Sequence, residues 1–327
     1  MGLLPYEKED FTIIERYKSL PVKELGKEPK DRTITELIDY GFINLDKPSG
    51  PTSHEAADFV KKILDAKMVG HGGTLDPRVS GVLPIGLNKA TRILEAFLLG
   101  GKEYVCEMSI HKEVTKKELL AAFKHFTGKI MQLPPIKSNV KRQLREREIY
   151  YIEVLEVYPR KALFKVGCEA GTYIRKLCTD IGEYLGTKAH MQDLRRTKAS
   201  CFNEDNSFSL HELQEAKSLY DEKGDESLLR KIIQPVELSV KHLRRIVISN
   251  GAVMPLLNGS PLMLPGLVKL SKGIKKDEVV AIYTLKDELL GLGEALMTTQ
   301  EMMDNGKGIC VKLKKVIMQL SAYAVKK

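Results

Sequence analysis

The sequence predicts an α+β fold with a mixed, largely antiparallel sheet, followed by a small C-terminal β-barrel. Three observations indicate this architecture. Strand-like and helix-like segments alternate without the regular strand–helix–strand order of a doubly wound sheet. After His242 the chain changes to short β runs separated by glycine, a pattern typical of a barrel. The length of 327 residues leaves room for one large domain and one small domain.

These observations divide the chain into three parts, which are an extension over residues 1–40, a large domain over 41–240 and a small domain over 241–327. The extension is polar and of mixed charge, and three prolines interrupt any helix there. We therefore expect it to pack over another part of the protein, the C-terminal domain, rather than to form a core of its own.

Local patterns predict the first elements of the large domain. Residues 42–45 are predicted to form a strand, and Thr52-x-x-Glu55 is a capping box that begins a helix. A second helix is expected from residue 88 to residue 100, and 102–110 alternates like a strand with one apolar face. The first helix has its apolar residues at helical spacing: Ala56, Phe59, Val60, Ile63 and Leu64.

The second half of the large domain continues this mixed pattern. A helix is expected through residues 119–126, and a pair of strands over 150–157 and 162–168. Further helices are expected from Tyr173 and after the capping box at Ser209. The barrel is predicted from its β runs: Arg245–Ser249, Val279–Tyr283 and Ile309–Leu313.

Composition excludes several classes of protein. No apolar run approaches the roughly 18–20 residues of a membrane span, and the N-terminus lacks the pattern of a signal peptide, so we expect a cytoplasmic protein without membrane contact. The five cysteines never form C-x-x-C, which argues against a disulfide framework and a thiolate metal site. No phosphate-loop or dinucleotide motif occurs. The net charge of +9 permits a nucleic-acid partner without demonstrating one.

Two charged residues stand out. Asp76 is the one carboxylate of the glycine-rich loop 71–81, and it precedes a proline. An Asp-Pro pair is often only a turn, so Asp76 is either a turn residue or a functional carboxylate. Arg175 lies in the first turn of a predicted helix, where the helix dipole disfavours a cation. A nearby carboxylate would compensate for this, and the alternative is a solvated surface arginine.

Three other features allow two interpretations each. Tyr104 shares a strand face with apolar residues, so it belongs either to the core or to a site. His54 follows the helix cap Thr52, where free backbone amides can face a phosphate, or it is simply exposed. The basic run 137–148 is predicted to be a projecting loop that contacts phosphates, or an ordinary solvated face. Its cations are Lys137, Lys141, Arg142, Arg145 and Arg147.

Long motifs in this sequence resemble the TruB family of RNA pseudouridine synthases. Two of them look like its dyskerin branch, which is the catalytic subunit of H/ACA guide-RNA particles, and the lack of long lysine-rich tails resembles the archaeal form. The resemblance covers about residues 35–235, and residues 242–318 are similar to a PUA RNA-binding domain. The motifs are GFINLDKPSGPTSH (41–54) and GHGGTLDP (70–77) for the family, and 134–150 and GTYIRKLC (171–178) for the branch.

The resemblance implies a pseudouridine synthase catalytic domain that isomerises specific uridines to pseudouridine, without cofactor or metal. Asp76 would be the nucleophile, attacking either C1′ of the ribose or C6 of uracil. Arg175 would pair with Asp76 and favour its charged form, and Tyr104 would stack on the flipped base. Leu194 would line the uracil pocket, and His54 would lie near the extruded base.

The resemblance also implies RNA and protein partners. The basic run belongs to a thumb, residues 131–151, that clasps the substrate RNA. Target choice is delegated to an H/ACA guide RNA, with ribosomal RNA as the main target and transfer RNA as an additional one. The expected protein partners are a small zinc-ribbon-type peptide, a glycine/arginine-rich-protein homologue and a kink-turn-binding ribosomal-type protein. Two alternatives stay open: an enzyme that acts alone on the tRNA T-loop, and a catalytically silent RNA scaffold.

Overall fold

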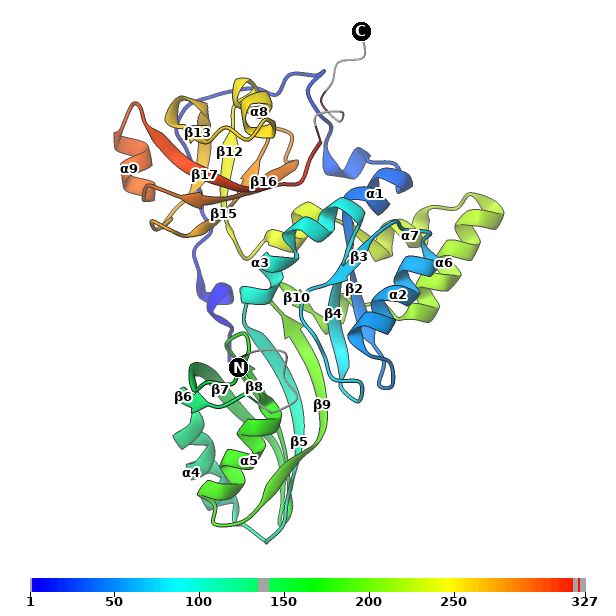
Figure 1. Ribbon diagram of the computed structural model, residues 1–327, viewed down its shortest axis with the longest axis vertical. Coiled ribbons are helices and arrows are strands. Elements are labelled where there is room, and N and C mark those ends of the chain that lie inside the picture. The colour runs from blue at the N-terminus through cyan, green and yellow to red at the C-terminus, as the bar shows by residue number, and fades with distance from the viewer. Residues whose placement is uncertain (1, 135–140, 320–322, 324–327) are drawn as a thin grey trace.

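Two β-sheets organise the protein in the computed structural model, which describes residues 2–134, 141–319 and 323. The larger sheet and its helices fill the lower and right-hand parts of Figure 1, and the smaller sheet forms the upper left part. The chain starts beside the lower body, passes along the smaller sheet and then enters the larger one (Figure 1). This is the predicted α+β class with a second, β-rich part.

The larger sheet is mixed and largely antiparallel, since β4–β9 is the parallel pair among its described pairings. Its long strands β5 and β9 run from the middle of the molecule down into the lower body (Figure 1). The strand order is β11 (Ile233–Pro235), β2 (Gly41–Lys47), β4 (Ser80–Leu87), β9 (Ala189–Ala199), β5 (Lys102–Ile110), β8 (Lys161–Cys168), β7 (Arg145–Tyr158) and β6 (Gly128–Gln132), with β10 (Phe202–Asn203) beside β9 and β3 (Val69–His71) beside β4.

Helices cover this sheet, and both predicted caps are present. The Thr52 hydroxyl accepts a hydrogen bond from the Glu55 amide at 3.1 Å, and the Ser209 hydroxyl accepts one from the Glu212 amide at 3.2 Å. The helices are α1 (Ile34–Tyr40), α2 (Ser53–Ile63), α3 (Leu94–Leu99), α4 (Lys116–Phe126), α5 (Ile174–Tyr184), α6 (Leu210–Lys223) and α7 (Ser227–Ile232), and short 3₁₀ turns are η1 (Pro5–Lys8), η2 (Pro29–Asp31), η3 (Asn88–Ile93), η4 (Glu204–Asn206) and η5 (Val236–Val240).

The predicted helix from residue 88 is correct only in its second half. Asn88 has a φ of +41°, and its side chain accepts a hydrogen bond from the Met68 amide at 2.9 Å. The chain therefore leaves β4 through a left-handed residue and makes the 3₁₀ turn η3 before α3 can begin.

Two residues of predicted apolar stripes, Phe59 and Leu120, are 45% exposed, because α2 and α4 pack through a narrower stripe than their periodicity indicates.

The smaller sheet includes a strand from the N-terminal extension. Ile13–Glu15 (β1) pairs antiparallel with Leu267–Ser271 (β14), so the extension adds an edge strand to the C-terminal part. The strand order is β1, β14, β12 (Arg244–Ile248), β15 (Val279–Tyr283), β16 (Leu289–Ala295), β17 (Ile309–Val316) and β13 (Leu262–Met263), and the helices beside it are α8 (Asn250–Leu257), α9 (Thr299–Asp304) and the 3₁₀ turn η6 (Leu264–Gly266).

The two sheets share one buried apolar cluster, which includes Phe42 and Phe97 from the larger part and Ile246 and Val280 from the smaller. His242 lies at this junction. Its Nε2 is 3.1 Å from the carbonyl oxygen of Ala96, while its Nδ1 is buried without a partner. Because a continuous core joins the two parts, their relative orientation is set by packing and not by a flexible linker.

The buried ring of His242 makes stability sensitive to acid. Burial lowers the pKa of His242 to about 4. Between the ordinary histidine pKa and this value the unfolded chain binds a proton that the folded protein does not, so stability falls as the pH falls through this window. We expect the wild-type protein to lose about 2 kcal/mol between pH 7 and pH 5 through this residue.

The matched variant His242→Gln keeps a donor for the Ala96 carbonyl but cannot titrate. Urea unfolding of both proteins at pH 7 and pH 5 measures the difference, since all other titrating groups are shared. Equal losses of stability in the two proteins would show that His242 does not contribute to the acid sensitivity.

None of the helices in the described part of the chain combines the length and the apolar composition needed to cross a bilayer.

Candidate active site

Asp76 is presented to solvent by a loop that is anchored on both sides. The buried hydroxyl of Ser53 accepts a hydrogen bond from the Leu75 amide at 2.8 Å and donates to the Leu75 carbonyl at 3.0 Å. The buried ammonium of Lys47 donates to the Pro77 carbonyl at 3.1 Å. Because the residues before and after Asp76 are both fixed, a carboxylate with 54% exposure is still held in one place.

The loop can lie this close to the sheet because of its glycines. A Cβ at Gly81 would lie 2.2 Å from the carbonyl oxygen of Arg196 on β9, and Gly81 has a φ of +104°. Only glycine satisfies both conditions. The glycine at this end of the loop therefore sets the distance between the Asp76 loop and the strand that carries Arg196.

Arg175 and Asp76 form an ion pair between Arg175 Nη2 and Asp76 Oδ2. Arg175 lies in the first turn of α5, and its side chain is 58% exposed. The predicted compensation of this cation by a carboxylate is thus present, although the two residues are 99 positions apart. The pair places a negative oxygen beside a cation on an open surface that a large substrate can reach.

Tyr104 is half-buried on β5, between strands β8 and β9. Its direct cross-strand neighbours are Val166 on β8 and Arg196 on β9. Burial raises the pKa of the Tyr104 hydroxyl, and the charge of Arg196 opposes that rise. Tyr104 is therefore a neutral phenol at the edge of the core, close enough to the pair for the Asp76 charge to affect its pKa.

His54 lies beside a histidine that the sequence reasoning did not single out. The rings of His54 and His71 meet edge to face, with centroids 4.7 Å apart. His71 belongs to the same loop as Asp76, and its Nδ1 is buried without a hydrogen-bond partner. Burial and then the nearby His54 lower the pKa of His71, which favours the neutral ring. The glycine-rich loop motif contained this signal, because its first residue is His71.

Leu194 lies on β9 with 7% exposure, opposite Cys106 of β5. It belongs to the main core of the larger part. Its position two residues before Arg196 places both side chains on the same face of the strand, since successive residues alternate. Leu194 is thus a core residue on the same face of β9 as Arg196.

The basic run is only partly a loop. Lys137 lies outside the described residues, and Lys141 and Arg142 are exposed without regular structure. Arg145 and Arg147 are instead part of strand β7, which corrects the prediction of a projecting loop over the whole run. The reason is pairing with β6, in which Arg145 lies opposite Gln132. The basic run thus divides into an irregular part, with Lys141 and Arg142, and a strand part, with Arg145 and Arg147.

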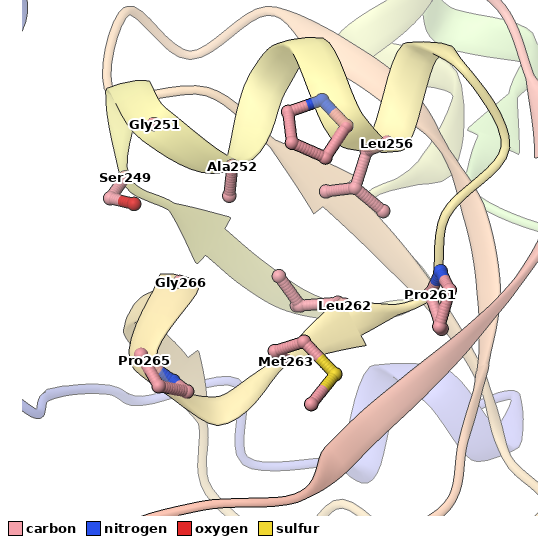
Figure 2. Close-up of a pocket in the computed structure, with 10 residues that line it drawn as sticks. Ser249, Gly251, Ala252, Leu256, Pro261, Leu262, Met263, Pro265 and Gly266 are labelled. Carbon is pink, nitrogen blue, oxygen red and sulfur yellow. The ribbon is translucent and has the colours of Figure 1, made fainter.

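A cavity lies in the smaller part of the protein, where the sequence analysis assigned no site residue. It has a volume of about 310 Å³ and lies between α8 and the turn η6. Figure 2 shows Ala252 and Leu256 of the helix pointing toward Leu262, with Met263 and Pro265 on the opposite side. Its walls are small or apolar, and glycines expose backbone groups.

The main site offers an exposed carboxylate, Asp76, that its loop holds in a fixed position. An exposed carboxylate oxygen lies beside an arginine, and a half-buried tyrosine lies nearby. No group of three or more His, Cys, Asp or Glu side chains suited to a metal ion occurs within the described residues. The site can therefore orient a carboxylate against an electrophilic carbon of a large, anionic substrate.

Comparisons with known proteins agree along the whole chain. Four family models match: DKCLD (NUC011) domain over residues 6–57, TruB family pseudouridylate synthase (N terminal domain) over 61–174, tRNA pseudouridylate synthase B C-terminal domain over 175–247, and PUA domain over 244–317.

Curated relatives and solved structures cover nearly the full length. The chain is 49% identical to a "Probable tRNA pseudouridine synthase B" of Pyrococcus abyssi (98% of this chain, 96% of the relative) and 47% identical to one of Methanocaldococcus jannaschii (97% and 94%). Among structures it is similar to "Crystal Structure of a Cbf5-Nop10-Gar1 Complex" (TM-score 0.94, 47% identity, 98% of each chain) and to "Structure of H/ACA RNP bound to a substrate RNA containing 2'-deoxyuridine" (0.92, 45%, 98% and 99%).

Proposed function

Since the chain belongs to the TruB family of pseudouridine synthases, we propose that it isomerises specific uridines of RNA to pseudouridine, at positions that a guide RNA selects. Full-length similarity to a structure described as an H/ACA RNP bound to a substrate RNA is the observation that supports guidance most directly. Ribosomal RNA is the main proposed target. The names of the curated relatives favour transfer RNA as a second substrate class.

Asp76 is the proposed nucleophile, because it is the exposed carboxylate that the loop holds against Arg175. It attacks C1′ of the ribose or C6 of uracil. The glycosidic bond from N1 breaks, the uracil turns, C5 forms the new bond to C1′, and the bond to Asp76 is broken again. C5 loses its proton and N1 gains one, so the product is an isomer of the substrate. The reaction has no net redox change and needs no cofactor. The target base must leave its stack, since its reacting atoms are inaccessible in a paired strand.

The remaining site residues receive supporting roles. Tyr104 stacks on the flipped base, and Leu194 forms the apolar wall of the uracil pocket. His54, with His71 beside it, fills space near the extruded base. The cations Lys141, Arg142, Arg145 and Arg147, together with Lys137 outside the described residues, bind the phosphates of the substrate strand.

Partners and domain roles complete the proposal. One similar structure is a complex with proteins named Nop10 and Gar1, which supports assembly of this chain with small accessory proteins of the expected kinds. We divide the chain into the extension 1–40, the catalytic domain 41–240 and the PUA domain 241–327.

The PUA cavity of about 310 Å³ receives an unpaired base of the guide RNA. The archaeal relatives support a cytoplasmic location.

Guide dependence can be tested on the assembled particle. The protein, its accessory proteins and a target RNA are incubated with a matched guide, with a guide of scrambled targeting sequence, or with none. Pseudouridine is detected chemically, because the isomerisation does not change mass. We expect at least about tenfold more product with the matched guide, since pairing places the uridine at Asp76.

Transfer RNA alone forms the other arm of this experiment. Equal product in transfer RNA with and without guide, together with no product in the guided target, would favour an enzyme that acts alone. Guided RNA binding without any product would indicate a silent scaffold.

A further inference from the structure

Arg196 is a buried arginine that lacks an acidic partner in the described part of the chain. It is 1% exposed and lies on β9. Its Nε donates to the Val82 carbonyl at 2.7 Å, and its Nη2 donates to the Gly73 carbonyl at 3.1 Å. A buried charge is costly unless something compensates for it, and two neutral carbonyls compensate only in part. We therefore ask what else stabilises the charge of this buried guanidinium.

Tyr104 is the residue directly across from Arg196 in the sheet. The two residues are direct cross-strand neighbours on β9 and β5, so their side chains project from the same side of the sheet. Burial raises the pKa of the Tyr104 hydroxyl, and the charge and hydrogen bonding of Arg196 act against that rise. Burial likewise lowers the pKa of Arg196, and Tyr104 opposes that change. The electrostatic interaction thus favours the charged guanidinium of the buried Arg196 beside the half-buried phenol of Tyr104.

The direction of this interaction follows from the donor inventory. A guanidinium can only donate hydrogen bonds, so in any hydrogen bond between these two side chains the Tyr104 oxygen is the acceptor. In such a bond the hydroxyl hydrogen of Tyr104 would point away from Arg196, where it can be donated to a bound base.

Arg196 also contacts the loop of the nucleophile. Gly73 lies three residues before Asp76 and has a φ of +123°, and its carbonyl accepts from Arg196. Val82 follows the same loop on β4, and the backbone of Arg196 packs against Gly81. One side chain therefore holds both ends of the Asp76 loop and the tyrosine beside it.

We propose that Arg196 is a positioning residue for the isomerisation, which couples the orientation of Tyr104 to the position of the Asp76 loop. The proposal rests on the proposed function and deepens it. Arg196 does not touch the substrate. It acts through Tyr104, whose hydroxyl it orients toward the base, and through the Gly73 carbonyl, which keeps Asp76 at a constant distance from that base.

A double-mutant cycle tests this coupling. Single-turnover rates of pseudouridine formation are measured in the assembled particle for wild type, Arg196→Gln, Tyr104→Phe and the double variant. We expect Arg196→Gln alone to slow the reaction about a hundredfold, as small misplacements of reacting groups do. In the Tyr104→Phe background the same change should cost at least tenfold less, because the hydroxyl that Arg196 orients is already gone. The affinity for target RNA should change less than threefold.

Arg195→Gln is the matched control. Arg195 directly precedes Arg196 on β9, and its side chain forms ion pairs with Asp46 and Glu204. Because it points to the other face of the strand, its loss should leave the rate within threefold. If Arg196→Gln fails to fold, Arg196→Lys replaces it, since a lysine keeps the charge but cannot serve three partners at once. Equal costs in the Tyr and Phe backgrounds would overturn the proposal while leaving the function intact. Absence of product in wild type would instead contradict the proposed function.

Discussion

Asp76→Asn should abolish pseudouridine formation while the particle still binds its RNA. The amide has the shape of the carboxylate but no charge, so it cannot form a bond to C1′ or C6. Asp76 is 54% exposed and its loop is held by Ser53 and Lys47, so the substitution should leave the fold unchanged. We expect no product in an assay that detects one part in about ten thousand of the wild-type rate, a range typical of nucleophile removal.

The control for this experiment is Asp65→Asn. Asp65 is an exposed aspartate with a φ of +51°, a backbone conformation that asparagine tolerates well. It removes the same charge from the same domain and should leave the rate within twofold. Turnover of Asp76→Asn near the wild-type rate would contradict the assignment of the nucleophile, and loss of RNA binding would show that the side chain holds the RNA instead.

Arg32→Met should destabilise the protein by about 3–5 kcal/mol, the usual cost of leaving a buried charge unpaired. Arg32 belongs to the N-terminal extension and is 2% exposed. Its two terminal nitrogens donate to both carboxylate oxygens of Glu237, at 2.8 and 2.7 Å. Glu237 also accepts from the Leu289 amide of the smaller sheet at 2.9 Å. Removing Arg32 therefore leaves a buried carboxylate between the extension and both domains.

Urea unfolding, followed by circular dichroism, measures this loss. The double variant Arg32→Met/Glu237→Gln should recover part of the stability, because no uncompensated charge then remains. Lys30→Met is the surface control: Lys30 pairs with Glu28 in full contact with solvent, and its loss should not shift the midpoint. An unchanged midpoint for Arg32→Met would show that the extension does not contribute to stability through this pair.

The net charge of the protein and the charges at the site have different roles. The net charge of +9 is consistent with RNA binding but does not identify the reaction. The proposed reaction depends on one carboxylate, Asp76, and on how the fold surrounds it with cations. Arg175 contacts this carboxylate directly, whereas Arg196 acts at a distance through the loop and Tyr104.

Much of the local structure could be predicted because it depends on short spacings. The capping boxes at Thr52 and Ser209, the alternation over 102–110 and the glycine-separated strands after His242 all appear as predicted. Each depends on contacts between residues at most four positions apart, or on a repeat of two along a strand. The long motifs around Asp76 and Arg175 identified the family for the same reason, because they are contiguous in the sequence.

Only the tertiary structure determined which residues from distant parts of the sequence are neighbours. The partner of Asp76 is 99 residues away, and the buried guanidinium beside Tyr104 comes from the other end of the domain. The left-handed turn at Asn88 is held by the amide of Met68, and the early start of β7 is caused by pairing with β6. The PUA cavity appears only when α8 folds over η6. Sequence determined the elements and the candidate residues, because those depend on local periodicity. Packing determined their neighbours, because contacts between distant segments leave no period in the sequence.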